Sequence, residues 1–182
     1  MPTLDEIQQV HEIIVESLLE LINRDSDILG YPPFHNPIGI GHLNRKLHEV
    51  AINHCFAKYL EICIRPIHEL RTHYVDIEYN RYFDDFKRVQ TERGEKKVRP
   101  DILIHRRMEG GHYLVIEAKK GRVSALDILK VKGLITDPNY SYQFGLTISY
   151  CHDPNQIIGT LYYSNGNRAV AHPVPINVPV QH

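Results

Sequence analysis

Two short apolar runs, separated by a glycine-containing turn, constrain the fold of this chain more than any other feature. Residues 101–105 and 113–119 are rich in Ile, Leu and Val, and Gly110 and Gly111 lie between them. β-Branched residues favour strands, and glycines favour the tight turn of a hairpin. Strands without an alternating polar face are usually covered on both sides. We therefore expect a buried hairpin within a sheet that is flanked by helices.

Charged residues stand where these two runs begin and end. Asp101 follows Pro100 at the start of the first run, and the second run ends in Glu117 and Lys119. The central turn would place Asp101 opposite Glu117, with Cβ atoms ~5 Å apart, and Lys119 would point to the same face as Glu117. Facing carboxylates repel each other unless one is protonated or a cation binds both. Mg²⁺ prefers such oxygens, and a nearby lysine could orient a water molecule.

A third carboxylate comes from the helix that we expect over residues 42–64. Glu49 shares the apolar stripe of this helix with Ile52 and Phe56, so it should face the domain. A buried charge needs a partner or a metal ion. Glu49 could reach the same end of the sheet as the other two carboxylates. The structural alternative is an ion pair with Arg45, one helical turn earlier.

The periodicity of the remaining chain predicts the order helix, helix, strand, strand, strand, helix, strand, strand. Helices are expected over residues 3–23, 42–64 and 124–135, and strands over residues 71–83, 101–105, 113–119, 143–150 and 157–163. The helix between the third and fourth strands indicates a crossover connection. The whole pattern is that of an α/β fold with a mixed central sheet.

Length and composition are those of one globular domain. The chain has 182 residues, of which 42% are hydrophobic and 24% charged. We expect a single domain over residues 1–170, with an accessory helix in residues 1–24 and a proline-containing extended tail over 171–182. The apolar stripe of the accessory helix favours packing on the core, and a homodimer contact is the alternative. Residues 24–41 and 84–98 are expected to be loop and polar connection.

Charge and cysteine content limit the cellular context. The net charge of −1 excludes a large basic field, so a nucleic-acid contact would depend on a local patch. More than half of the 21 Lys and Arg lie between residues 87 and 132, which is typical of a solvated face but also suits a phosphate track. No apolar run is long enough to cross a membrane. The three cysteines have no CxxC spacing, which favours a reduced, cytoplasmic chain.

The charges of the hairpin also have structural interpretations. Glu117 could pair with Lys119, or with Arg106 across the hairpin, and exposed ion pairs of this kind contribute little. His105 and His112 could face each other and bind a metal ion, or they could flank the site or lie in solvent. These alternatives stay open on the local sequence.

The charged residues, taken with the order of elements, resemble the PD-(D/E)XK nuclease superfamily, whose fold is called restriction-endonuclease-like. Three parts of the sequence carry the match: Pro100-Asp101, Glu117-Ala118-Lys119, and Glu49 in an upstream helix. The element order from residue 42 to about residue 163 is also similar to the αβββαβ core of that family.

The resemblance implies a metal-dependent nuclease that hydrolyses phosphodiester bonds of nucleic acid, with DNA the expected substrate. Asp101 and Glu117 would bind Mg²⁺ or Mn²⁺, with the backbone carbonyl of Ala118 as a further ligand. Lys119 would position the attacking water, and Glu49 would complete the acidic cluster directly or through water. The alternative is a non-catalytic member of this fold that binds nucleic acid or a protein partner. A protein partner could also target the nuclease.

Two further residues belong to the predicted site. Glu78 lies on the strand before Asp101, where its side chain could approach the carboxylates. Gln143 begins the fourth strand, and related enzymes place a polar residue from this later region near the metal or the phosphate. A third function class, a small interaction protein that uses the N-terminal helix and the proline-rich tail, would need neither residue.

Overall fold

The apolar hairpin predicted from the sequence forms the middle of a sheet. In the computed structural model, β6 (Ile102–His105) and β7 (Leu114–Lys119) pair antiparallel, with Ile102 opposite Ile116. The regular pairing ends at Ile102, and the backbone N–H of Asp101, just before it, also donates to the carbonyl of Ile116. Asp101 therefore lies beside this part of β7, and its position directly opposite Glu117 stays a prediction.

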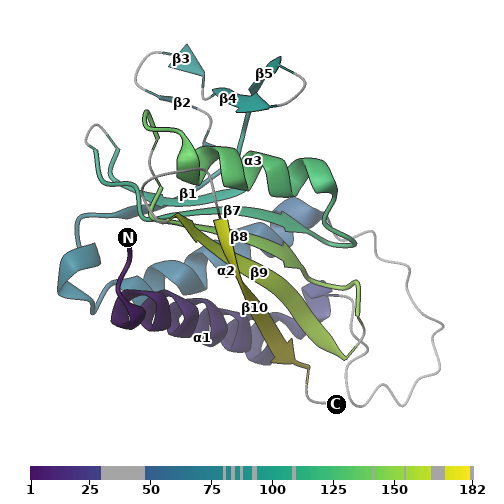
Figure 1. The fold of residues 1–182 in the computed structure, drawn as a ribbon. Helices are drawn as coiled ribbons and strands as arrows, with labels where there is room; N and C mark the ends of the chain where they lie inside the picture. The colour runs from purple at the N-terminus through teal and green to yellow at the C-terminus, as the bar shows by residue number, and fades with distance from the viewer. Residues whose placement is uncertain are drawn as a thin grey trace, which may run out of the picture.

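The hairpin belongs to a six-stranded mixed sheet with the order β1-β6-β7-β8-β9-β10 (Figure 1). The other strands are β1 (Tyr74–Ile77), β8 (Phe144–Ser149), β9 (Gln156–Ser164) and β10 (Ala171–Pro179). Strands β7 and β8 run parallel, and the other neighbouring pairs are antiparallel. The structure describes residues 1–29, 48–79, 81–82, 85–86, 88–91, 94–107, 110–140, 142–153, 155–164 and 171–180.

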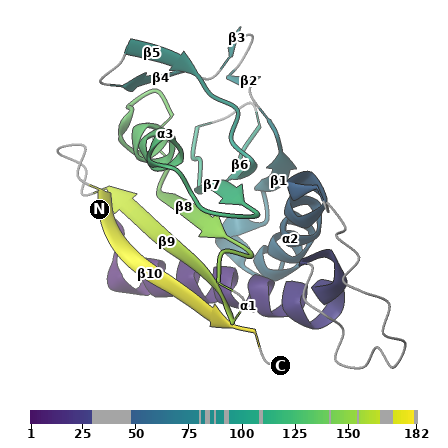
Figure 2. The same ribbon diagram turned by 90° about the vertical axis from the view of Figure 1, so that its right-hand side faces the viewer.

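Helices cover both faces of this sheet (Figures 1 and 2). Helices α1 (Leu4–Leu29) and α2 (Glu49–Ile64) lie on one face, and α3 (Ala125–Thr136) lies on the other. Alternate residues of the hairpin serve the two cores: Ile116 packs in the core with α1 and α2, and Val115 packs in the core with α3. Coverage of both faces explains why these strands are apolar throughout. The mixed α/β fold predicted from the sequence is confirmed.

Local sequence fixes where two helices begin. Thr3 and Glu6 form a reciprocal capping pair at the start of α1, as the spacing suggests. Ser124 caps α3, and the Asp127 side chain accepts a hydrogen bond from the Ser124 backbone in return. Helix α3 connects β7 to the parallel strand β8, so the predicted crossover is confirmed. Within the described residues, no helix has both the length and the apolar character that crossing a membrane requires.

Several predicted boundaries differ from the structure. Helix α1 continues to Leu29, beyond the predicted end at residue 23, with non-helical backbone at Asp25. The predicted strand over residues 71–83 divides, because β1 ends at Ile77 and Glu78 has a positive φ of 52°. The polar segment after it contains two small hairpins, formed by β2 (Arg81–Tyr82) with β3 (Asp85–Phe86) and by β4 (Arg88–Thr91) with β5 (Gly94–Lys97). Residues 30–47, with Arg45 and the start of the predicted second helix, lie outside the described residues.

Only some of the apolar residues of α3 are buried. Leu126 and Leu129 are 41% and 42% exposed. The buried apolar residues are Val131, Leu134 and Ile135, and Asp127 is buried with them. The helix is apolar over more than half its circumference, so its sequence alone does not choose the face that packs.

Strand β10 and helix α1 both join the core, although only the helix was expected to do so. Residues 171–179, predicted as an extended tail, form β10 and pair with β9 along its whole length. Because β10 is an edge strand, prolines such as Pro175 are tolerated there. Helix α1 packs on the core through Val10, Ile14 and Leu18, all fully buried, which confirms the favoured interpretation of its stripe.

Candidate functional site

The predicted acidic cluster assembles where β6 begins and β7 ends. Asp101 immediately precedes β6, and its Oδ2 accepts hydrogen bonds from the Ala118 N–H at 2.8 Å and from Lys119 Nζ at 3.1 Å. Burial raises the pKa of Asp101, and the Glu49 carboxylate adds to the rise, while the Ala118 amide and Lys119 oppose it. Asp101 is thus a partly desolvated carboxylate held by the end of the neighbouring strand.

Helix α2 brings Glu49 to the same place. Its Oε1 lies 3.1 Å from Lys119 Nζ, and its Oε2 accepts the Lys120 N–H at 2.9 Å. The position of α2 is fixed one turn later, where the buried Tyr150 hydroxyl, just after β8, donates to Asn53 Oδ1 at 2.9 Å. The prediction that Glu49 reaches the carboxylates of the sheet therefore agrees with the structure.

Lys119 joins the two acids from different elements. Its ammonium group lies 3.1 Å from one oxygen of Glu49 and 3.1 Å from one oxygen of Asp101, and its side chain is 25% exposed. Burial alone would lower the pKa of Lys119, but the Asp101 and Glu49 carboxylates raise it above its usual range. Lys119 is therefore a protonated, oriented cation at the rim of the sheet.

Glu117 is the most buried carboxylate of the cluster, with its side chain 1% exposed. Its Oε2 accepts a hydrogen bond from Lys130 Nζ at 3.3 Å, whereas its Oε1 has no hydrogen-bond partner in the described part of the chain. Burial raises the pKa of Glu117 to about 7, with repulsion from Asp101 adding to the rise and Lys130 opposing it. One oxygen of a buried acid is thus left unsatisfied at the predicted metal position.

Lys130, one of the basic residues between residues 87 and 132, is a direct neighbour of this site. Its Nζ also lies 3.2 Å from Asp127 Oδ1, and Asp127 is held by the Ser124 hydroxyl at 2.7 Å. The pairing of Glu117 with Lys130 replaces both partners expected from the sequence, Lys119 and Arg106. The sequence could have indicated this contact, because the crossover helix after β7 must cover one face of that strand and Lys130 lies on this helix.

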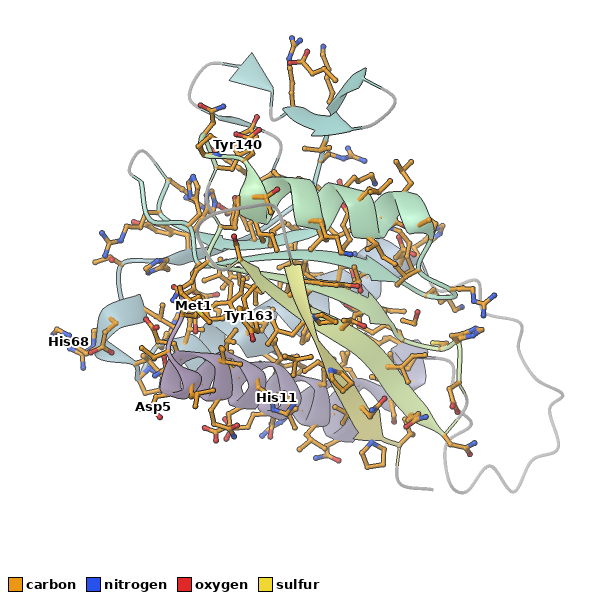
Figure 3. All side chains as sticks on the ribbon, viewed as in Figure 1. Met1, Asp5, His11, His68, Tyr140 and Tyr163 are labelled. Carbon is orange, nitrogen blue, oxygen red and sulfur yellow. The ribbon has the colours of Figure 1, made fainter. Side chains whose placement is uncertain are left out.

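Glu78 and Gln143 are not brought into the cluster. The Glu78 backbone N–H donates to the Asp101 carbonyl, but its exposed side chain pairs with Arg99 at 3.4 Å. Gln143 precedes β8 and donates from Nε2 to Glu6 Oε1 at 3.2 Å, near the start of α1, where Figure 3 labels Asp5. Because β7 and β8 are parallel and the carboxylates gather where β7 ends, Gln143 lies at the opposite end of the sheet.

The histidines of the hairpin also lie away from the carboxylates. His105 ends β6, and its Nε2 contacts Asp76 Oδ2 at 2.9 Å. The rings of His105 and His112 face each other with centroids 5.7 Å apart. His105 is buried, so the alternative that it lies in solvent is wrong, and it stands at the end of β6 opposite to Asp101.

The donor set fits a hard cation that keeps most of its water. Among the described residues, no three His, Cys, Asp or Glu side chains gather closely enough to hold a metal ion on their own. Mg²⁺ does not need such a cage, since it commonly binds one or two carboxylates and fills its other positions with water and phosphate oxygens. Asp101 is close enough to Glu117 to raise the pKa of Glu117, and the buried Oε1 of Glu117 is an acceptor that a cation would satisfy.

Chemically, the arrangement combines acids for a cation with ammonium groups for an anion. Lys119 and Lys130 are both 25% exposed. Close to these residues in the chain, Lys120 is half-buried, and Arg122 and Arg99 are exposed. No protein-family model and no curated protein matches this chain. The geometry of these side chains is therefore the basis for assigning a function.

Proposed function

We propose that this protein is a metal-dependent nuclease of the PD-(D/E)XK type that hydrolyses phosphodiester bonds, with DNA as the expected substrate. The observation that carries the proposal is the pair Asp101 and Glu117 at the end of a central hairpin, with Asp101 17% and Glu117 1% exposed. Lys119 contacts Asp101, and Glu49 joins from α2. The order α2-β1-β6-β7-α3-β8 supports a restriction-endonuclease-like core.

The residues of the site divide into ligands and orienting groups. Asp101, Glu117 and the carbonyl of Ala118 would hold Mg²⁺ or Mn²⁺, which when bound would activate water and neutralise charge on phosphorus. Lys119, held by Glu49 and Asp101, would orient the nucleophilic water by donating a hydrogen bond to it. Glu49 accepts hydrogen bonds from Lys119 and from the Lys120 amide, so it would hold Lys119 in place. It would also complete the acidic cluster, directly or through water.

The surroundings of the site suit a nucleic-acid backbone. Arg122 is exposed just after β7, and Arg99, 59% exposed, lies two residues before Asp101. Such cations at a groove or rim supply most of the affinity for phosphates.

The three cysteines are unbonded, which supports the expected cytoplasmic location. A homodimer contact through α1 would have to use its exposed face, because its apolar stripe packs in the core.

The second candidate is a non-catalytic module of the same fold that binds nucleic acid or a protein. One observation favours it: Lys119 pairs with both Glu49 and Asp101, so these two carboxylates already have a cationic partner within the protein. A thermal shift with Mn²⁺ discriminates between the two, because a ligand that binds the native state raises the unfolding temperature. A module that binds no cation should show no such shift.

The test is cleavage of supercoiled plasmid, single-stranded DNA and RNA, with Mg²⁺ or Mn²⁺ and with a chelator. We expect the wild type to cleave only with the metal, and Asp101→Asn and Lys119→Met to lose about 100-fold or more. Lys132→Met is the matched control. Lys132 lies on α3, as Lys130 does, but its ammonium group lies over the ring of Tyr162 on β9 and not beside the carboxylates. Equal cleavage by all variants, or cleavage in chelator, would show that the proposed mechanism is wrong.

A further inference from the structure

The carboxylates of the cluster pair with two lysines that lie on different elements. Lys119, on β7, contacts Glu49 and Asp101, whereas Lys130, on α3, contacts Glu117. The Lys130 Nζ lies 3.3 Å from Glu117 Oε2, and the Glu117 side chain is 1% exposed. Water therefore cannot replace this contact easily. Lys119 cannot take it over without leaving the two carboxylates that it joins.

Lys130 is itself held in place by the start of its helix. Its Nζ lies 3.2 Å from Asp127 Oδ1, one turn earlier. The other oxygen of Asp127 accepts from the Ser124 backbone N–H at 3.0 Å and from the Ser124 hydroxyl at 2.7 Å. Asp127 is 9% exposed, so it is a shielded part of the capping box and not a surface charge. A continuous chain of contacts thus runs from the cap of α3 to Glu117.

We propose that Lys130 and Asp127 are positioning residues that orient Glu117 for cation binding, an inference that rests on the proposed function. Lys130 engages Oε2 and so holds the carboxylate in one orientation. The other oxygen, Oε1, is buried and has no hydrogen-bond partner within the described residues, so it is the oxygen available to a cation. Groups that hydrogen-bond a ligating carboxylate typically affect metal affinity about 10–100-fold.

A positioning role and simple charge neutralisation predict opposite effects of removing Lys130 on metal affinity. If Lys130 only compensated the charge of Glu117, it would compete with a metal ion, and its removal would strengthen metal binding. If Lys130 orients Glu117, its removal weakens metal binding, because the carboxylate can then turn away. A purely structural role would change the stability of α3 without a specific effect on metal affinity.

The experiment is calorimetric titration of the full chain with Mn²⁺, without nucleic acid. Lys130→Met should weaken Mn²⁺ binding about 10–100-fold. Lys130→Arg, which keeps a cation that can donate to both acids, should restore most of the affinity. Asp127→Asn keeps an oxygen for the Ser124 cap but loses the charge that holds Lys130, so it should give an intermediate loss. Lys132→Met is the control and should bind as the wild type does.

The outcomes separate this inference from the proposed function. If the wild type binds no Mn²⁺, the metal-dependent nuclease fails and the inference fails with it. If the wild type binds and Lys130→Met binds equally or more tightly, only the positioning role is overturned. Should Lys130→Met not fold, Asp127→Asn decides, and unchanged affinity in that variant would overturn the inference.

Discussion

The buried carboxylate of Glu117 should lower the free energy of unfolding as the pH rises to neutrality. Its pKa rises from the usual 4.5 to about 7, first because burial removes water and then because Asp101 repels its charge. Below pH 4.5 the group is protonated in both the folded and the unfolded chain, so the fold carries no penalty. Between these two values the unfolded chain releases the proton first, and stability falls. Above pH 7 the penalty is constant.

The expected size of this penalty follows from the same two pKa values. Each pH unit between them corresponds to about 1.4 kcal/mol, so a rise from 4.5 to about 7 gives about 3 kcal/mol. No discount for solvent screening applies, because the side chain is 1% exposed. A typical domain has a free energy of unfolding of about 5–15 kcal/mol, so the effect should be large enough to measure.

The assay is urea unfolding of the metal-free wild type and of Glu117→Gln, each below pH 4.5 and above pH 7. Glutamine resembles the protonated acid, so the two proteins should be about equally stable at the lower pH. At the higher pH, Glu117→Gln should be more stable than the wild type by about 3 kcal/mol. Glu16→Gln, at an exposed position of α1, is the control and should show little change at either pH. A difference between wild type and Glu117→Gln that is independent of pH would refute the burial argument.

Two substitutions test how α3 is held over the site. Ser124→Ala removes the cap of α3 and should lower the free energy of unfolding by about 1 kcal/mol in chemical denaturation. Thr3→Ala is the corresponding change at the start of α1. An unchanged free energy of unfolding in Ser124→Ala would contradict the capping role. Gly145→Ala should lower the free energy of unfolding by about 1–3 kcal/mol, because the added Cβ would lie 2.4 Å from Val131 Cγ1. Gly121→Ala is the control and should be nearly neutral, since its added Cβ would have no atom within 4 Å. Equal effects of the two changes on the melting temperature would show that α3 does not pack on β8 this closely.

The parts of the site that the sequence predicts are those that depend on local rules. The turn of the hairpin predicts that Asp101 lies beside the end of the second run, and the hydrogen bonds from the Ala118 N–H and Lys119 Nζ to Asp101 agree. The helical spacing of Glu49 with Ile52 and Phe56 puts its carboxylate on the inner side of α2, and the contact with Lys119 agrees. These predictions need only the period of one element and the pairing of two adjacent strands.

The parts that were missed depend on how elements cross. Lys130 reaches Glu117 only because α3 packs over β7, and the apolar residues of α3 do not choose its packing face. Gln143 was placed at the wrong end of the sheet, although the crossover already implied a parallel pair. In a parallel pair the start of β8 lies beside the start of β7, far from Lys119.

The C-terminal strand was missed for a different reason. Prolines lack a backbone N–H and are unfavourable in the middle of a sheet, so Pro173, Pro175 and Pro179 indicated a tail. The same property is compatible with an edge strand, which needs its donors on one side only. Strand β10 pairs with β9 from Ala171 to Pro179 and closes the sheet at that edge. Composition described these residues correctly as extended, but pairing depends on a neighbour that the local pattern does not reveal.

The difference between Glu49 and Glu117 is the physical reason to favour a binding site over a structural ion-pair network. Both oxygens of Glu49 are engaged, one by Lys119 and one by the Lys120 amide, as expected for a structural carboxylate. Glu117 is more buried, yet only one of its oxygens has a hydrogen-bond partner among the described residues. A buried charge that is incompletely paired costs stability, and an apolar side chain in its place is often neutral or stabilising. A ligand that binds Oε1 would offset this cost, and a hard cation is the ligand whose chemistry fits a buried carboxylate oxygen with a second carboxylate, Asp101, nearby.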